Sequence, residues 1–103
     1  MRINGNLDAP DEAVADFCRR WKIVEFAFFG SVLRDDFRPD SDIDVLVTFE
    51  RDAPWSLFDI VAMQDELSLM LGRKVEIVEK DSLRNPFRRR SIIKSAKTVY
   101  THG

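Results

Sequence analysis

The sequence is poor in the side chains that most often act as nucleophiles, general bases and zinc ligands. It holds one cysteine, Cys18, and one histidine, His102, which is next to last. A single cysteine excludes an internal disulfide and argues against a thiolate metal cluster. A single histidine argues against a Ser-His-Asp or Cys-His arrangement and against a histidine-ligated zinc. Any chemistry is therefore expected from carboxylates, basic side chains, hydroxyls and a bound ion.

Long apolar runs and a strong charge of one sign are also missing. No apolar stretch approaches the ~20 residues that cross a bilayer, and residues 1–10 lack the basic and apolar segments of a signal peptide. The net charge is -2, so the chain has no general attraction to nucleic acid or to an anionic membrane. We therefore expect a cytoplasmic protein without a membrane segment.

The residues that are present predict one ordered domain over residues 1–103. A length of 103 residues and a hydrophobic content of 45% suit a single folded core. Apolar spacing and turn signals predict helices that start near 8–10 and at 85, a short helix over 31–36, a helix over 57–71, and strands over 24–29, 43–49 and 73–79, with 99–100 as a short strand or a packed segment. This order predicts an α/β (α+β) fold, in which helices pack on a small mixed β-sheet.

The helix expected over 57–71 has clear ends. Ser56 and Asp59 match the capping-box pattern, and Gly72 is a residue type that often follows a helix. Trp55, Phe58 and Leu69 either close the edge of the core or contribute to a partner interface. At helical spacing Phe58, Ala62 and Leu69 fall off the main apolar face, which is expected to contain Leu57, Ile60, Val61, Gln64, Leu67 and Leu71.

The segment from Gly30 to Asp44 carries the strongest functional signal. Gly30 has no Cβ, so a phosphate can approach the backbone closely. Ser31 adds a hydroxyl and a backbone N–H at a helix start, where an anion is favoured, and Arg34 follows about one turn later with donors for phosphate oxygens. Alone, this pattern is weak and is more typical of an ordinary strand-turn-helix junction with a surface arginine.

Asp42 and Asp44 add a second signal at the start of the next strand. Residues two positions apart in a strand point to one face, and two carboxylates placed side by side repel unless a cation lies between them. Mg²⁺ takes one or two carboxylates together with substrate phosphate oxygens, and two such ions can clamp the attacking and leaving oxygens of a displacement. The alternative is that one aspartate caps the turn and the other is solvated.

Glu76 is the expected third carboxylate. It lies on the strand predicted over 73–79, on the side opposite Val75 and Ile77. If this strand neighbours the strand over 43–49, three carboxylates converge, and one of them helps to take the proton from an attacking hydroxyl. The alternative is a solvated strand residue.

Gly30-Ser31, Arg34 and Ser41-Asp42-Ile43-Asp44 resemble the motif of the DNA polymerase β-like nucleotidyltransferases. Within that superfamily the chain is similar to the minimal nucleotidyltransferases (MNT domains), the antitoxins of HEPN/MNT toxin–antitoxin pairs. The resemblance extends over residues 14–100 and includes residues 73–78 and the segment that begins at Asn85-Pro86.

The resemblance implies a polymerase β-like palm core and an enzyme that uses Mg²⁺, at a two-metal site, and ATP. It implies transfer of AMP, with loss of pyrophosphate, to a tyrosine hydroxyl of a HEPN-domain ribonuclease toxin, which is the expected partner. Carried over, Asp42, Asp44 and Glu76 are the catalytic and metal-binding residues. Gly30 and Ser31 bind the triphosphate, and Arg34 assists at the phosphates.

Two departures from the family pattern bear on activity. The third carboxylate is usually Asp in this family, whereas here it is Glu76, and Asp35 stands where a glycine often follows the arginine. The near-ideal octahedron around Mg²⁺ tolerates misplaced ligands poorly. One alternative is therefore a weak or inactive antitoxin that neutralises its toxin by binding alone. Transfer to a small molecule is a weaker alternative, because it needs a further substrate-binding domain.

The C-terminal region is basic. The direct interpretation is a solvated helix face, and the other is a docking surface for an acidic partner or an electrostatic aid to phosphate binding. Nucleic acid is not expected as a ligand, because interleaved exposed aromatics are missing and the total charge is negative. The basic residues are Arg84, Arg88, Arg89, Arg90, Lys94 and Lys97.

Overall fold

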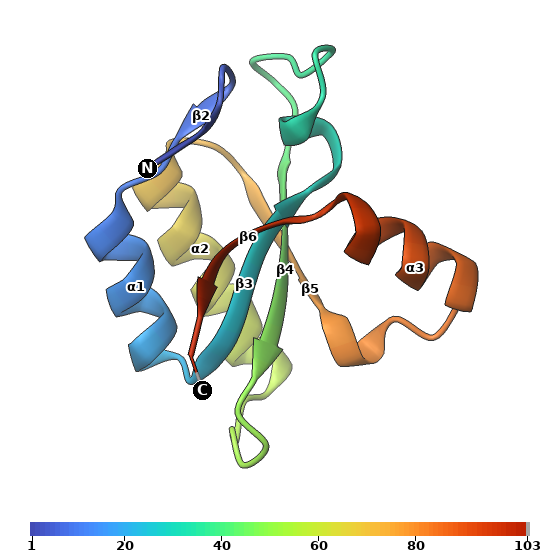
Figure 1. Cartoon of the computed structure of the whole chain (residues 1–103). Helices are drawn as coiled ribbons and strands as arrows, with labels where there is room; N and C mark the ends of the chain where they lie inside the picture. Colours follow the sequence, from blue (N-terminus) through green and yellow to red (C-terminus); the bar gives the residue numbers. More distant parts are fainter. Residues whose placement is uncertain (103) are drawn as a thin grey trace.

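The computed structural model describes residues 1–102 and shows a mixed sheet between layers of helices, with a small hairpin at the N-terminus (Figure 1). Among residues 1–102, every helix falls short of the length and apolar content that a bilayer span requires. The elements are β1 (Arg2–Asn4), β2 (Leu7–Asp8), α1 (Asp11–Arg20), β3 (Ile23–Phe29), η1 (Gly30–Leu33), β4 (Ile43–Phe49), α2 (Leu57–Leu71), β5 (Val75–Glu79), η2 (Lys80–Ser82), α3 (Pro86–Ser95) and β6 (Lys97–Thr101).

The main sheet has the strand order β5-β4-β3-β6. β4 and β5 are parallel, whereas β3 pairs antiparallel with both β4 and β6. The mixed sheet expected from the sequence is therefore confirmed, with the apolar strand β3 at an interior position. The segment left open as a strand or a packed segment is an edge strand, β6, in which Tyr100 pairs with Phe26.

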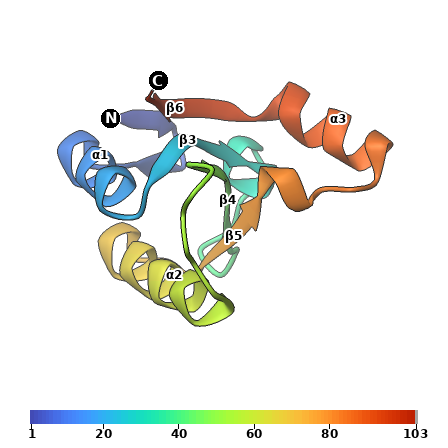
Figure 2. The same ribbon diagram turned by 90° about the horizontal axis from the view of Figure 1, so that it is seen from below.

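The two faces of the sheet are covered differently. Phe26, Phe28 and Val45 point to the face on which α1 and α2 pack, and they join the main core with Phe17 and Leu67. The other face carries a smaller apolar cluster, against which part of α3 packs. Figure 2 shows, from below, that α3 lies on the opposite side of the sheet from α2. The alternation of side chains along each strand is the reason that one strand serves both layers.

α3 covers only part of the second face. Ile92 and Ala96 pack against a cluster that contains Phe29, Leu46 and Leu83. All ten residues of α3 are at least partly exposed. The rest of this sheet face, including the start of β4, is therefore left for polar side chains.

The structure corrects the expected extent of the short helix. η1 is a single 3-10 turn that ends at Leu33, whereas the sequence predicted a helix over 31–36, because the backbone becomes extended at Arg34. The hairpin of β1 and β2 was not predicted, although Asn4-Gly5-Asn6 is a turn signal between its strands.

The expected core face of α2 was wrong in part. Met63 and Leu67 are fully buried, whereas Leu57 is 82% exposed and Val61 is 52% exposed. α2 carries apolar residues around most of its circumference, so their spacing could not identify the buried side. Its ends are as expected, since the Ser56 N–H donates to Asp59 Oδ2 (2.9 Å) and Gly72 adopts a φ of 70°.

Two leucines of α2 provide a direct test of this orientation. Leu67→Ala should lower the free energy of unfolding by about 2 to 5 kcal/mol, because it opens a cavity in the main core. Leu69→Ala, at a position that is 87% exposed, should change it by less than about 0.5 kcal/mol. Urea denaturation of the two variants checks this, and equal losses of stability would contradict the orientation.

Candidate active site

Gly30 connects the end of β3 to η1 in a conformation that favours glycine. Its φ is +75°, and a Cβ at this position would clash with the Asp44 carboxylate, above all with Oδ2. The glycine therefore has two roles: it permits the left-handed backbone, and it leaves space for Asp44.

Ser31 lies beside the start of β4. Its half-buried hydroxyl donates to the backbone carbonyl of Asp42 at 3.4 Å. This bond connects the turn after β3 to the segment that carries the aspartates. The turn and the carboxylates, separated in the sequence, are thereby adjacent in space.

Asp44 and Glu76 are direct neighbours in the sheet. The parallel register pairs Asp44 of β4 with Glu76 of β5, and on its other side Asp44 pairs with Phe29 of β3. Paired residues on adjacent strands point to the same face, so both carboxylates project on the side that α3 covers in part. Asp42 lies two positions before Asp44, and its Oδ2 is 4.0 Å from Lys74 Nζ. The condition inferred from the sequence, that the strand of Glu76 neighbours the strand of Asp44, is thus met.

The electrostatics of Asp44 reflect this crowding. Burial raises the pKa of the Asp44 carboxyl above its ordinary value, and the nearby carboxylates of Glu76 and Asp42 raise it further. Arg34 and Arg88 act on it in the opposite direction. Two neighbouring carboxylates disfavour the charged form of this half-buried carboxyl, and a bound cation would stabilise that charged form.

These oxygen donors fit a divalent ion such as Mg²⁺, which prefers carboxylate ligands. In the part of the chain from residue 1 to 102, no group of three or more His, Cys, Asp or Glu side chains is already arranged to hold a metal ion. Asp42 and Asp44 are half-buried and Glu76 is exposed, so a shared ion would require side-chain movement at this open surface.

Arg34 does not point at the carboxylate pair. Its Nε donates to Asp36 Oδ1 at 3.2 Å, and both side chains are exposed. Arg34 therefore lies at the edge of the site, close enough to influence Asp44 and free enough to turn toward an anion.

The N-terminal hairpin supports the turn after β3, a role that the sequence did not reveal. Asn4 Nδ2 and Asn6 Nδ2 each donate to the Val32 carbonyl at 2.8 Å, and Asn6 Nδ2 also donates to the Arg34 carbonyl at 2.8 Å. The carbonyls of Val32 and Arg34 are thereby satisfied by the hairpin. The only available signal was the hairpin turn itself, because these contacts join distant parts of the chain.

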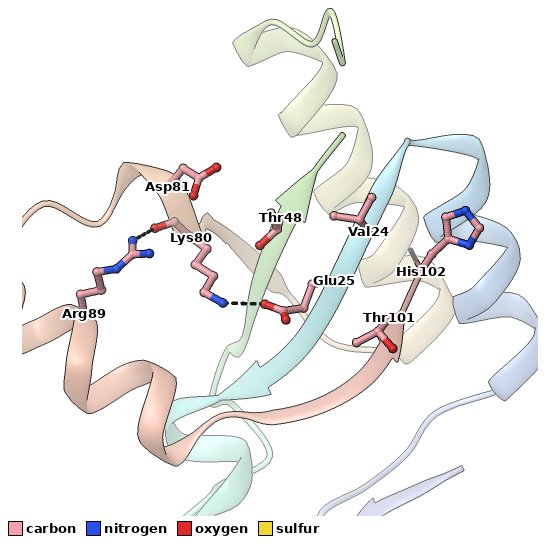
Figure 3. Close-up of a pocket in the computed structure, with 8 residues that line it drawn as sticks. All are labelled: Val24, Glu25, Thr48, Lys80, Asp81, Arg89, Thr101 and His102. Carbon is pink, nitrogen blue, oxygen red and sulfur yellow. Dashed lines mark hydrogen bonds and ion pairs between the residues drawn. The ribbon is translucent and has the colours of Figure 1, made fainter. Parts of the chain in front are cut away.

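A cavity of about 510 Å³ lies further along the same sheet face (Figure 3). Glu25 Oε1 accepts from Lys80 Nζ at 2.8 Å, and Arg89 Nη1 donates to the Lys80 carbonyl at 2.6 Å. Thr48 and His102 also line it. Since Glu25 and Lys80 neutralise each other and the cavity contains none of the predicted site residues, we do not assign it to the active site.

The chain matches the model of the nucleotidyltransferase domain family over residues 11–99. It belongs to this family. The resemblance inferred from Gly30-Ser31 and from Asp42 and Asp44 is thus confirmed at the level of the family, and the chain is an enzyme of the nucleotidyltransferase type.

Several relatives of this nucleotidyltransferase are named protein adenylyltransferases. A protein of Methanocaldococcus jannaschii, provisionally named a protein adenylyltransferase, is 36% identical over 73 residues, which are 71% of this chain and 72% of the relative. The protein adenylyltransferase MntA of Thermococcus cleftensis is 38% identical over 66 residues, which are 64% of this chain and 65% of the relative.

Solved structures share the fold. One that is provisionally described as a minimal nucleotidyltransferase is 37% identical, with a TM-score of 0.70 over 84% of this chain and 86% of that one. An MNT antitoxin, solved with a tri-AMPylated HEPN toxin of Shewanella oneidensis, has a TM-score of 0.64 over 89% of this chain and 70% of that one. At 17% identity, the second likeness concerns the fold alone.

Because Gly30 lies so close to Asp44, a side chain at position 30 should lower the free energy of unfolding by an unusually large amount. Gly30→Ala should lower the free energy of unfolding by more than Gly72→Ala does, because both residues have a positive φ but only Gly30 faces a side chain. The strain shared by both is about 1 to 3 kcal/mol. Urea denaturation compares the two variants, and equal costs would mean that Asp44 moves aside freely.

The raised pKa of Asp44 predicts the pH dependence of stability. The folded state binds this proton more tightly than the unfolded state, so the contribution is favourable at low pH and is lost as pH rises through the folded pKa. In metal-free buffer, Asp44→Asn should therefore raise the melting temperature at pH 7 and have a smaller effect near pH 4.

The control for this prediction is Asp40→Asn, at an exposed position in the preceding turn, which should change the free energy of unfolding by less than about 0.5 kcal/mol. Thermal melts at both pH values test the pair. A lower melting temperature for Asp44→Asn at pH 7 would show that the carboxylate is stabilising without a metal.

Proposed function

We propose that this nucleotidyltransferase is a Mg²⁺-dependent protein adenylyltransferase that transfers AMP from ATP to a tyrosine hydroxyl of a HEPN-domain ribonuclease toxin, and so acts as its antitoxin. The observation that carries the proposal is the placement of Asp44 beside Glu76 in the β4–β5 register, with Asp42 two positions earlier. The protein adenylyltransferase names of the relatives and the HEPN toxin bound by a protein of the same fold support the acceptor class.

In this proposal Asp42, Asp44 and Glu76 hold the metal, and Gly30 and Ser31 receive the triphosphate. When bound, Mg²⁺ would neutralise the charge of the carboxylates and of the phosphates at once. The open position of Gly30, which no side chain fills, lets a phosphate approach the backbone of the turn. Arg34 would leave its contact with Asp36 and donate to phosphate oxygens.

The reaction is a displacement at the α-phosphorus of ATP. The acceptor oxygen forms a bond to this phosphorus, the bond to the oxygen that bridges to the β-phosphate breaks, and pyrophosphate leaves. The proton of the acceptor hydroxyl passes to a carboxylate of the site. Of the three carboxylates, Glu76 is the most exposed and so the most accessible to that proton.

Label transfer tests the proposal. With ATP labelled at the α-phosphate, Mg²⁺ and a HEPN-domain toxin from the same genome, we expect label on the acceptor, and Asp42→Asn and Asp44→Asn should each lower the rate by at least about 100-fold. Chelation of the metal should have the same effect. Transfer that persists in both variants would remove these residues from the mechanism.

A second candidate is neutralisation by binding alone. It is favoured by Glu76, which stands where the family usually has Asp, and by the open arrangement of the carboxylates among residues 1–102. If binding alone neutralises the toxin, the Asp44→Asn variant should still block the toxin in the absence of nucleotide. Glu76→Asp separates the two candidates further, because it should raise the transfer rate of a slow enzyme and leave neutralisation by binding unchanged.

A further inference from the structure

α2 presents a large apolar surface to solvent. Leu57 is 82%, Phe58 87%, Val61 52% and Leu69 87% exposed. At ~100° per residue these side chains and Asp65 fall within an arc of about 120°, opposite the side that Met63 and Leu67 bury. We call the surface formed by Leu57, Phe58, Val61, Asp65 and Leu69 the α2 outer face.

The size of the α2 outer face is that of an interaction site. Its four apolar side chains together expose on the order of 500 Å², and exposed apolar patches of this size are often functional. The sheet side of α2 is covered through Met63 and Leu67, whereas the apolar side chains of the α2 outer face have no cover.

A hollow extends this surface at the first turn of α2. It has a volume of about 350 Å³ and is lined by Leu57 and Ile60 of α2 and by Ile77 and Val78 of β5. Interfaces gain most of their affinity where a large side chain enters such an apolar pocket. The face and the hollow share Leu57, so one partner can contact both.

The charges around this surface are mainly acidic. Asp65 lies near the middle of the α2 outer face, and Glu79 lines the hollow. A neighbouring hollow, which also contains Leu57, is lined by Glu50, Glu79 and Asp81, with Arg51 as its basic residue. A complementary partner is therefore apolar at its centre and carries Lys or Arg opposite Asp65.

The position of Asp65 argues against a symmetric pair of copies. In a two-fold dimer the same surface meets itself, so two antiparallel α2 helices would bring Asp65 close to its own counterpart. The acidic rims would also face one another. A different protein with a basic, amphipathic helix satisfies both the apolar surface and the charge.

We propose that the α2 outer face docks the protein partner of this enzyme through an apolar helix that carries a basic residue opposite Asp65. The inference rests on the proposed function in that the partner is the HEPN-domain toxin. α2 packs on the sheet face opposite Asp44 and Glu76. The two surfaces lie on opposite sides of the sheet, so docking and transfer can be measured separately.

Phe58 and Phe87 provide a matched test. Phe58 is 87% exposed on α2 and Phe87 is 84% exposed on α3, so neither change to Asp should disturb the fold. Calorimetric titration with a HEPN-domain toxin from the same genome should show at least about tenfold weaker binding for Phe58→Asp and less than about threefold for Phe87→Asp. Asp65→Lys should weaken binding in the same direction.

Several results would overturn the proposal. One is unchanged binding by Phe58→Asp, and another is a larger loss from Phe87→Asp. A wild-type chain that is dimeric alone and becomes monomeric with Phe58→Asp would identify a second copy as the occupant, and absence of binding to the HEPN-domain protein would exclude this partner.

Asp44→Asn should bind normally. If the complex forms through Phe58 but no AMP is transferred, docking stands and the proposed activity fails.

Discussion

The parallel pairing of β4 with β5 is the arrangement on which the rest of the site depends. It places Asp44 beside Glu76 on one sheet face, and it does so next to a glycine whose missing Cβ leaves space for the Asp44 carboxylate. Three acidic groups at one sheet edge are unfavourable for the isolated protein, as the raised pKa of Asp44 records. A bound cation would offset this repulsion through its attraction to each carboxylate.

The two faces of the sheet have different roles, one in the core and one in the candidate site, and this explains how a chain of 103 residues carries both. α1 and α2 build the main core on one face, which supplies most of the stability through buried apolar area. The other face needs only the small cluster under α3, so it can expose polar groups. The N-terminal hairpin adds a brace, because Asn4 and Asn6 hold the carbonyls of the turn after β3.

Several features could be predicted because they are local. Gly30 and Ser31 after an apolar strand, the two aspartates at the start of the next, and the ends of α2 at Ser56 and Gly72 each depend on a few neighbouring residues. Other features failed where local signals are ambiguous. α2 is apolar on nearly all sides, so its spacing did not identify its buried side, and η1 proved shorter than its pattern indicated.

The sequence by itself determined the chemistry available: carboxylates and a glycine-serine turn, with hardly any histidine or cysteine. It also determined the family, through motif residues that lie close together along the chain. Only the tertiary structure decided that Glu76 is the neighbour of Asp44, that the hairpin braces the turn, and that Phe58 and Leu69 remain uncovered. These facts depend on which strands pair and which helix side meets the sheet. Strand pairing and helix orientation depend on packing among residues far apart in the sequence, and the spacing of residues within one segment does not reveal that packing.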